Sequence, residues 1–282
     1  MEWKIVHLDE TDSTNRWLRS FLSKEKRRKG EALQDSDKKT PKLLNSLENN
    51  QSLAVMAEYQ TAGKGCGSNS WESERGKNLT FSLLIHPKGI PARRQFQISM
   101  AVSLAVCEAL ERCFRPLSPT DSSPDSGEQE VSIKWPNDIY VGDKKICGML
   151  IENQLKGEEI KDSIIGIGLN VNQREFRSDA PNPVSLWQII HQETDREQLL
   201  DDVLSCLEHY LYQDIRQQYL QKLYRRKGFH PYRDKDETFM AEIVDVEDSG
   251  HLVLLDDSGR QRRYAFKEVQ FCLKETNCHN LP

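Results

Sequence analysis

The sequence predicts an α+β fold in which a large N-terminal domain of strands and helices is followed by a small all-β domain. Three observations indicate this fold. Residues 52–60 and 78–85 are short apolar runs bounded by polar residues, as buried strands are. Residues 95–114 are apolar nearly all round, which is typical of a buried helix. After residue 229 the pattern becomes short alternating segments separated by Ser-Gly turns, and these suit a small β-barrel.

The remaining elements follow from local patterns. Capping residues Asp12, Ser13 and Thr14 precede apolar residues at helical spacing, so we expect a helix with one apolar face. Residues 24–50 are mostly charged or amide-bearing, which indicates a surface excursion with one short helix near residues 43–47. The Pro-, Ser- and acid-rich stretch at 115–130 indicates a loop.

Further along the chain, residues 131–135 resume a strand pattern, and 139–152 have the form of a hairpin with its turn at Gly142 and Asp143. Residues 163–172 predict a strand with glycines where another backbone or a ligand comes close. Apolar residues at three- and four-residue steps over 195–226 predict one or two long amphipathic helices, ended by Gly228. We therefore place the domain boundary between 1–228 and 229–282.

Composition excludes several classes of protein. The 282 residues carry a formal net charge of -5, which argues against a nucleic-acid-binding surface over the whole protein. The first ten residues contain no apolar signal-peptide core, and no run of about 18 apolar residues occurs, so we expect no membrane span and a cytoplasmic location. The seven cysteines include no C-x-x-C pair, so we expect most to be reduced packing residues.

A glycine-rich loop follows the strand at 52–60. Gly63, Gly65 and Gly67 occupy alternating positions in "TAGKGCGSNSW". The spacing fits neither the P-loop, which needs Gly, four residues and then Gly-Lys-Ser/Thr, nor the dinucleotide fingerprint Gly-x-Gly-x-x-Gly. Trp71, which ends the loop, could stack on a base or pack in the core, and we favour the core.

A second group of polar residues lies at "IKWPNDIYVGDKKICG". Asn137 and Asp138 follow a proline at a strand end, and Lys134 and Lys145 lie beside buried strands. Taken alone, these are also ordinary turn chemistry and edge lysines. Together with the glycine-rich stretches at 63–67 and 166–168 they suit activation of a carboxylate by a nucleotide, because cations hold phosphates and glycines let backbone N–H groups approach.

Five motifs in order make the sequence resemble the biotin–protein ligases, also called biotin–[acetyl-CoA-carboxylase] ligases, over essentially its whole length. The resemblance implies a mixed β-sheet with flanking helices, related to the class II aminoacyl-tRNA synthetases, followed by an SH3-like barrel. The motifs are Asp12-Ser13-Thr14-Asn15, Ala57-Glu58-Tyr59-Gln60-Thr61-Ala62-Gly63, Lys134-Trp135-Pro136-Asn137-Asp138, Lys145-Ile146-Cys147-Gly148 and Gly166-Ile167-Gly168-Leu169-Asn170.

The resemblance also implies site residues. Lys145, Lys64 and Asp138 would be catalytic, and Asp138 would be the ligand of a Mg²⁺ ion, since a hard cation prefers carboxylate oxygen. ATP would meet Lys134, Asn137 and Asn170. Ser13 and Thr14 would combine ligand contact with helix capping, two compatible roles. The residues implied to bind biotin are Ser13, Thr14, Asn15, Gln60, Gly63, Lys64, Gly65, Cys66, Lys145, Gly148 and Gly166.

The implied reaction has two steps and uses biotin, ATP and Mg²⁺. Biotin's carboxylate is converted to biotinyl-5′-AMP, and the biotinyl group then passes to a lysine of a biotin carboxyl carrier protein. Two alternatives remain: a lipoate ligase or octanoyltransferase, although no Arg-Arg-x-Ser-Gly-Gly-Gly-type motif occurs, and a biotin-binding sensor without turnover. A monomer and a homodimer are both compatible with the sequence.

Two departures from the family lead to further expectations. The glycine loop of relatives commonly carries arginines, whereas this one has Lys64 and Cys66, so we expect the adenylate to be held less tightly. We also expect the loop to become ordered over the ligand.

Some relatives have an N-terminal helix-turn-helix domain and act as repressors. Here the motif at 12–15 starts almost at the first residue, so we expect no DNA binding.

Overall fold

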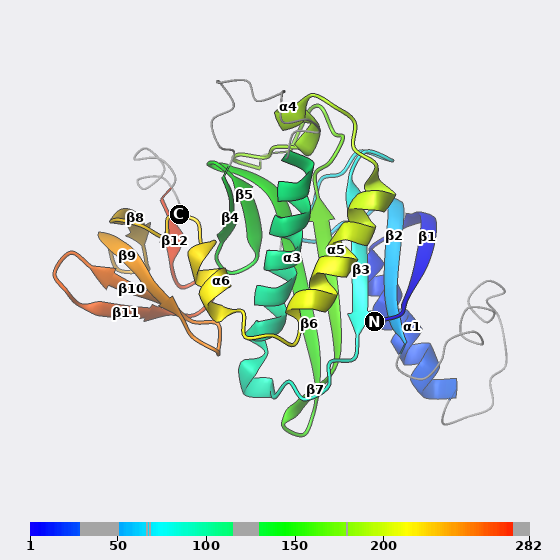
Figure 1. Ribbon diagram of the computed structural model, residues 1–282, viewed down its shortest axis with the longest axis horizontal. Helices are drawn as coiled ribbons and strands as arrows, with labels where there is room; N and C mark the ends of the chain where they lie inside the picture. Colours follow the sequence, from blue (N-terminus) through cyan, green and yellow to red (C-terminus); the bar gives the residue numbers. More distant parts are fainter. Residues whose placement is uncertain (29–50, 66, 68, 115–129, 179, 273–282) are drawn as a thin grey trace. The chain divides into compact units, whose positions relative to one another are not determined.

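The computed structural model describes residues 1–28, 51–65, 67, 69–114, 130–178 and 180–272 (Figure 1). These residues group into two compact units. The first unit contains Met1–Ala92, Gly148–Asp179 and Ser185–Arg196, and the second contains Arg93–Cys147, Ala180–Val184 and Glu197–Pro282. The boundary predicted between residues 228 and 229 is a different division of the chain and remains a proposal.

A seven-stranded sheet has the order β1-β2-β3-β7-β6-β5-β4. The β1–β2 pair is parallel, whereas β2–β3, β3–β7 and β4–β5 are antiparallel, so the predicted mixed sheet is confirmed. The strand β6 begins in the second unit and continues in the first. The strands are β1 (Trp3–Thr11), β2 (Ser52–Gln60), β3 (Leu79–Ile85), β4 (Val131–Lys134), β5 (Asp138–Val141), β6 (Lys144–Lys156) and β7 (Glu159–Leu169).

In the first unit, helix α1 (Thr14–Arg28) packs its apolar face on β2, β3 and β7. The contact forms a buried cluster of Leu18, Phe21, Leu22, Leu53, Val55, Leu84 and Ile164. Removing side chains of this kind from water supplies most of the favourable free energy of folding. The short helix α4 (Leu186–Ile190) begins with a capping box between Ser185 and Gln188. The packing of the buried cluster fixes the orientation of α1 on the sheet.

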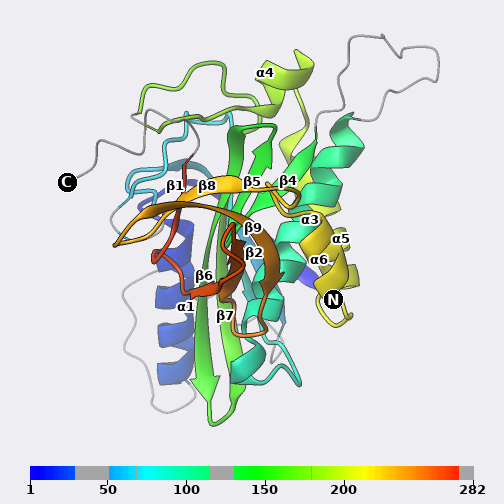
Figure 2. The ribbon, with the colours of Figure 1, turned by 90° about the vertical axis from the view of Figure 1, so that its left-hand side faces the viewer.

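In the second unit, helix α3 (Phe96–Phe114) lies beside α5 (Arg196–Tyr210), as Figures 1 and 2 show. Gln97 Nε2 donates to the Leu211 carbonyl at 3.1 Å, and the Tyr210 hydroxyl donates to Glu108 at 2.7 Å. A 3₁₀ turn, η1 (Ala92–Arg94), precedes α3, and the short helix α6 (Arg216–Gln221) follows α5. The buried helix predicted over 95–114 is confirmed.

The C-terminal part of the second unit is a five-stranded antiparallel sheet of order β11-β10-β9-β8-β12. The predicted all-β character is confirmed. Among the described residues no pairing joins β11 to β12, which is two residues long, so closure of the predicted SH3-like barrel stays a prediction. The strands are β8 (His230–Arg233), β9 (Thr238–Val246), β10 (Leu252–Asp256), β11 (Gln261–Tyr264) and β12 (Gln270–Phe271).

The observed secondary structure differs from the predicted one in two places. Strand β1 was not predicted, because none of its residues is fully buried and its sequence lacks the continuous apolar run of a buried strand. The helical pattern predicted over 195–226 ends at Tyr210 and resumes only for α6. Residues 222–224 instead run beside β4, where the amides of Ile133 and Tyr224 donate to the carbonyls of Lys222 and Ile133. The helix predicted near 43–47 and the loop at 115–130 lie largely or wholly outside the described residues.

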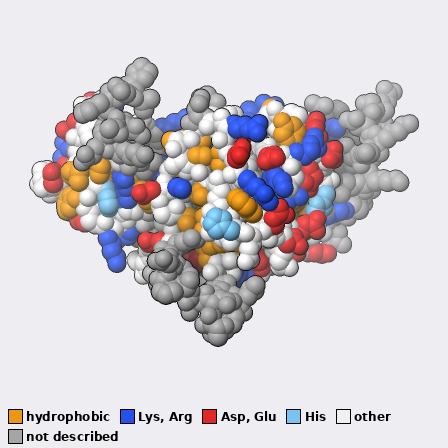
Figure 3. All heavy atoms as spheres, turned by 90° about the horizontal axis from the view of Figure 1, so that it is seen from above, with side chains coloured by type: hydrophobic (Ala, Val, Ile, Leu, Met, Phe, Trp, Pro, Cys, Tyr) orange, Lys and Arg blue, Asp and Glu red, His pale blue; other side chains and the backbone are white. Residues whose placement is uncertain are grey.

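The distribution of charged side chains on the surface and the burial of the cysteines agree with what the composition predicts. Acidic and basic side chains are interspersed on the face shown in Figure 3. The five cysteines of the described segments form no disulfide with one another, and four of them are buried, as expected for packing residues. Within the same segments, none of the helices combines the length and apolar character needed to cross a bilayer.

Candidate active site

The first unit contains a cluster of buried amides and hydroxyls where α1 meets the sheet. We call Thr14, Asn15, Gln60 and Ser82 the amide–hydroxyl cluster. Thr14 and Asn15 open α1, Gln60 ends β2 and Ser82 lies in the middle of β3. Thr14, Asn15 and Ser82 are each less than 10% exposed. Burying neutral polar groups costs free energy unless they are hydrogen-bonded, so their partners are informative.

Hydrogen bonds join all four members of the cluster. Gln60 Oε1 accepts from the Thr14 amide at 2.9 Å and from the Thr14 hydroxyl at 3.2 Å. The Thr14 and Ser82 hydroxyl oxygens are 2.6 Å apart, and Ser82 donates to Asn15 Oδ1 at 2.5 Å. Since the Thr14 side chain forms hydrogen bonds to β2 and β3, its role extends beyond capping α1. The sheet therefore holds the first turn of α1 in a defined orientation.

Four further residues complete this part of the site. Asn15 Nδ2 donates to Glu152 on β6 at 3.2 Å, and Arg19 forms an ion pair with the same carboxylate. Gly166 on β7 lies directly against Asn15, because a Cβ at this glycine would overlap the Asn15 side chain. Ser13, also buried, precedes the cluster, and its amide donates to Asp12 at 2.7 Å. Gly166 is therefore required for the close approach of α1 to the sheet.

The glycine loop folds back on itself. The Trp71 amide donates to the Gly63 carbonyl at 3.0 Å, and the Gly65 amide donates to the Asn69 carbonyl at 2.8 Å. A Cβ at Gly63 would lie 2.9 Å from the Trp71 carbonyl oxygen, which explains the glycine there. Lys64 is exposed and pairs with Ser70 through a β-bridge. Cys66, predicted to contact biotin, lies outside the described residues.

The second glycine of the Gly-Ile-Gly motif also faces a side chain. The Trp71 ring lies so close to Gly168 that a Cβ would overlap it, which supports the expected packing role of Trp71. Asn170 follows directly on β7 and is buried, and its carbonyl accepts from the Leu186 amide at 3.1 Å. The close neighbours of the two glycines are therefore the side chains of Asn15 and Trp71, where the sequence predicted another backbone or a ligand.

In the second unit, Lys145 and Asp138 form an ion pair, with 2.7 Å between Nζ and Oδ1. Asp138 begins β5 and Lys145 lies at the start of β6. Both side chains are partly buried, with 31% and 23% of their surface exposed. The backbone of Lys145 is fixed by hydrogen bonds with Asn182 and Val184. Gly148, three residues further along β6, belongs to the first unit.

Lys134 lies opposite Asp138 in the β4–β5 pair and is surrounded by aromatic rings. Its Nζ donates to the Tyr140 hydroxyl at 3.1 Å and lies 5.1 and 5.5 Å from the ring centroids of Tyr140 and Phe271. Burial lowers the pKa of the Lys134 ammonium, and nearby Asp138 opposes this shift. Asn137 occupies the turn between β4 and β5.

A metal ion was predicted at Asp138. Across the segments that the structure describes, no group of three His, Cys, Asp or Glu side chains could enclose a cation. Mg²⁺ is commonly held by one or two carboxylates together with waters and substrate phosphates, and a single carboxylate suits that mode. The Asp138 carboxylate thus fits a nucleotide-borne Mg²⁺, in competition with Lys145.

The structure therefore arranges the predicted residues in two groups. Ser13, Thr14, Asn15, Gln60 and Gly166 are neighbours in the first unit. Lys134, Asp138 and Lys145 are neighbours in the second, with Asn137 in the adjoining turn. Ser82, Glu152, Tyr140 and Phe271 were not predicted. The sequence signal that could have pointed to Ser82 is a hydroxyl-bearing residue within the apolar run of β3, all of whose residues are buried.

Comparisons with known proteins identify the family to which the chain belongs. The family described as "Biotin/lipoate A/B protein ligase family" matches residues 31–170. The bifunctional ligase/repressor BirA of Bacillus spizizenii is 30% identical over 257 residues, covering 82% of this chain and 71% of the relative. The biotin–[acetyl-CoA-carboxylase] ligase of Paracoccus denitrificans is 27% identical over 218 residues, covering 73% and 85%.

The fold has solved counterparts. The biotin protein ligase of Aquifex aeolicus in complex with biotin and ATP superimposes with a TM-score of 0.63 at 24% identity, covering 95% of this chain and 97% of that one. The two chains thus share their fold. The chain belongs to the biotin/lipoate A/B protein ligase family, and its resemblance to the biotin–protein ligases is confirmed.

Proposed function

We propose that the protein is an ATP-dependent biotin ligase that forms biotinyl-5′-AMP and transfers the biotinyl group to a lysine of a biotin carboxyl carrier domain. Family membership gives the reaction class. The observation that carries the choice of biotin is the amide–hydroxyl cluster. Neutral donors and acceptors are what an uncharged ureido ring needs, since an unpaired buried ureido group would lose affinity.

In the first step, an oxygen of the biotin carboxylate attacks the α-phosphorus of ATP. A new P–O bond forms, the bond to the bridging oxygen breaks, and pyrophosphate leaves. We assign Lys145 and Lys64 to the negative charge that develops, and Lys134, Asn137 and Asn170 to the nucleotide. A bound Mg²⁺ would neutralise phosphate charge, with Asp138 as its protein ligand. The biotin assignment keeps Ser13, Thr14, Asn15, Gln60, Gly63, Lys64, Gly65, Cys66, Lys145, Gly148 and Gly166.

In the second step, a carrier lysine attacks the carbonyl carbon of the mixed anhydride. An amide bond forms, the bond to the phosphate oxygen breaks and AMP departs. The attacking amine must be neutral, and the proton it loses passes to a base. Proton transfer to Asp138 and desolvation of the amine are the two candidates from the sequence for making the amine neutral, and desolvation is favoured because the Asp138 carboxylate is already engaged in the ion pair with Lys145. ATP as a substrate supports a cytoplasmic location.

Biotin-dependent exchange of labelled pyrophosphate into ATP tests the first step. We expect exchange with biotin, none without an acid, and little with lipoate. The reaction is reversible while pyrophosphate is present, so exchange reports adenylate formation without needing the carrier. Exchange that depends on lipoate would favour a lipoate ligase, and absence of exchange with either acid would favour a binding protein without turnover.

A further inference from the structure

The turn at residues 247–251, between β9 and β10, contacts the loop that follows β4. Trp135 Nε1 donates to the Gly250 carbonyl at 3.0 Å. The Trp135 side chain is 4% exposed, so this bond satisfies a buried N–H group. Trp135 also meets the Phe266 ring edge-on, with centroids 6.4 Å apart. Two separate segments of the C-terminal sheet therefore contact the residue that immediately precedes Pro136 and Asn137.

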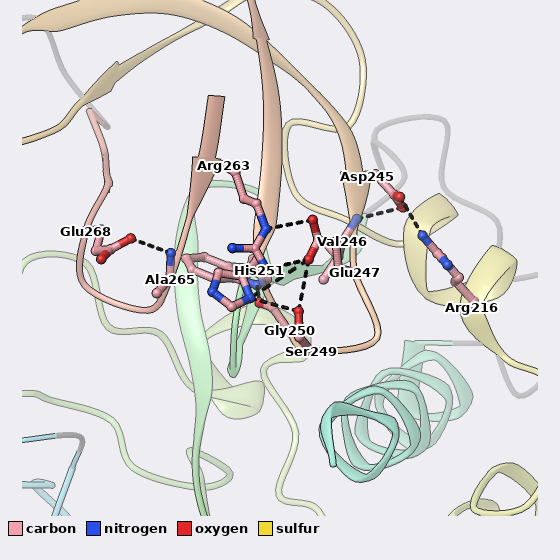
Figure 4. A network of polar contacts seen from close by, with 11 residues as sticks. Arg216, Asp245, Val246, Glu247, Ser249, Gly250, His251, Arg263, Ala265 and Glu268 are labelled. Carbon is pink, nitrogen blue, oxygen red and sulfur yellow. Dashed lines mark hydrogen bonds and ion pairs between the residues drawn. The ribbon is translucent and has the colours of Figure 1, made fainter. Parts of the chain in front are cut away.

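The turn is held by its own polar network, which Figure 4 shows. Arg263 donates from Nε and Nη2 to the two carboxylate oxygens of Glu247, at 2.7 and 2.8 Å. The Ser249 hydroxyl donates to Glu247 at 3.0 Å. The Gly250 amide donates to the Glu247 carbonyl at 2.8 Å, and the Glu247 amide donates to the His251 carbonyl at 2.9 Å. A bidentate guanidinium pair fixes geometry as well as charge.

The neighbours of Gly250 leave no room for a side chain. Its φ of +89° is in the region that favours glycine, and a Cβ added there would lie 2.7 Å from Cδ2 of Phe96. Phe96 in turn packs edge-on against Tyr219, which is fully buried, with 5.7 Å between centroids. Because the neighbouring ring is backed by the core, any side chain at position 250 must displace the turn from Trp135.

We propose that the 247–251 turn is a positioning element for the nucleotide-binding loop at residues 134–138. The Gly250 carbonyl fixes the Trp135 indole, and Trp135 fixes the backbone leading from Lys134 to Asp138. The C-terminal sheet would thus act in adenylate formation through these contacts. The proposal rests on the proposed function, which assigns Lys134, Asn137 and Asp138 to ATP and its metal.

The structure offers a matched pair of variants. Gly250→Ala and Gly259→Ala both place a side chain at a positive φ, +89° and +82°. Nothing lies within 4 Å of a Cβ at Gly259, whereas Gly250 faces Phe96 and Trp135. Both substitutions therefore carry backbone strain, and only Gly250→Ala disturbs the contact. Trp135→Phe is a second test, because it keeps an aromatic ring and removes the indole donor.

Pyrophosphate exchange and calorimetric MgATP binding provide the readouts. We expect Gly250→Ala and Trp135→Phe to raise the KM and Kd for ATP at least about tenfold, with the KM for biotin unchanged, because a small misplacement of binding groups is costly. Gly259→Ala should leave these constants at wild-type values. If Gly250→Ala does not fold, Trp135→Phe decides alone.

Three results would overturn the positioning role: wild-type ATP constants in Trp135→Phe, an equal shift in Gly259→Ala, or parallel rises in the KM for ATP and biotin that follow a lowered Tm. Wild-type protein without biotin-dependent exchange would instead refute the proposed function. In that event the calorimetric Kd for MgATP still decides whether the turn positions the loop.

Discussion

Lys144 and Lys145 are adjacent in sequence, but the structure separates their roles. Lys145 is partly buried and pairs with Asp138 at 2.7 Å, whereas Lys144 is exposed. Successive side chains of a strand point to opposite faces, so β6 can turn only one of the two toward Asp138. Composition and hydropathy treat the two lysines alike. Only the family motif selected Lys145, and its ion pair supports that selection.

Lys145→Met is expected to reduce kcat/KM for pyrophosphate exchange by about 10²–10³, because it removes a cation that stabilises developing charge in a partly desolvated position. Lys144→Met makes the same chemical change one residue away and is expected to stay within about twofold of wild type, as surface changes usually do. Equal losses in both variants, or no loss in Lys145→Met, would contradict the catalytic assignment of Lys145.

Ser82 and Glu152 show what the sequence could not reveal at this scale. Ser82 is separated by 67 residues from Asn15, and Glu152 by 137. Their proximity depends on the sheet order, in which β3, β7 and β6 are neighbours, and no local pattern encodes that order. Ser13, Thr14, Asn15 and Gln60 were predictable because they occur within continuous motifs.

At the scale of elements, buried segments were predictable and exposed ones were not. Strands β2 and β3 and helix α3 are almost wholly buried, so their apolar runs are unambiguous. The edge strand β1 alternates half-exposed polar residues and gives a weak signal. Residues 222–224 keep the apolar spacing of a helix, but Leu223 pairs beside Ile133 of β4, so tertiary contact overrides the local pattern.

The fit between α1 and β7 leads to a prediction at this scale. Gly166→Ala adds a Cβ that overlaps Asn15, so the first turn of α1 must shift. We expect a rise of about tenfold in the KM for biotin with little change in the KM for ATP. Gly89→Ala in the same unit meets nothing within 4 Å but has a φ of +74°, so it destabilises the unit without an overlap and serves as the control for general destabilisation. A biotin KM that rises equally in both variants would show general destabilisation instead.

At the scale of the whole molecule, ion pairs of the C-terminal sheet make stability depend on pH. Hydrogen bonds from Arg263 are the main cause that lowers the pKa of Glu247 from 4.5 to about 2. A carboxyl group whose pKa is depressed by folding stabilises the native state above its unfolded pKa. That contribution is lost as the pH falls through the folded value.

Glu247→Gln is therefore expected to lower the unfolding free energy at pH 7 by at most about 1 kcal/mol, since Glu247 and Arg263 are both partly exposed and screened. The difference from wild type should shrink as the pH falls from about 4.5 toward 2. Urea unfolding across this range measures it, and Arg263→Gln should behave similarly. A difference that stays constant with pH would argue against the ion pair as its cause.

The central claim is that this chain joins biotin to a protein lysine at the expense of ATP. The most direct test incubates the purified protein with biotin, MgATP and an isolated biotin carboxyl carrier domain, and reads the intact mass of the carrier. We predict the addition of one biotinyl group that requires both biotin and ATP and disappears when the acceptor lysine is replaced by arginine. An unmodified carrier, or a carrier modified with lipoate in place of biotin, would contradict the claim.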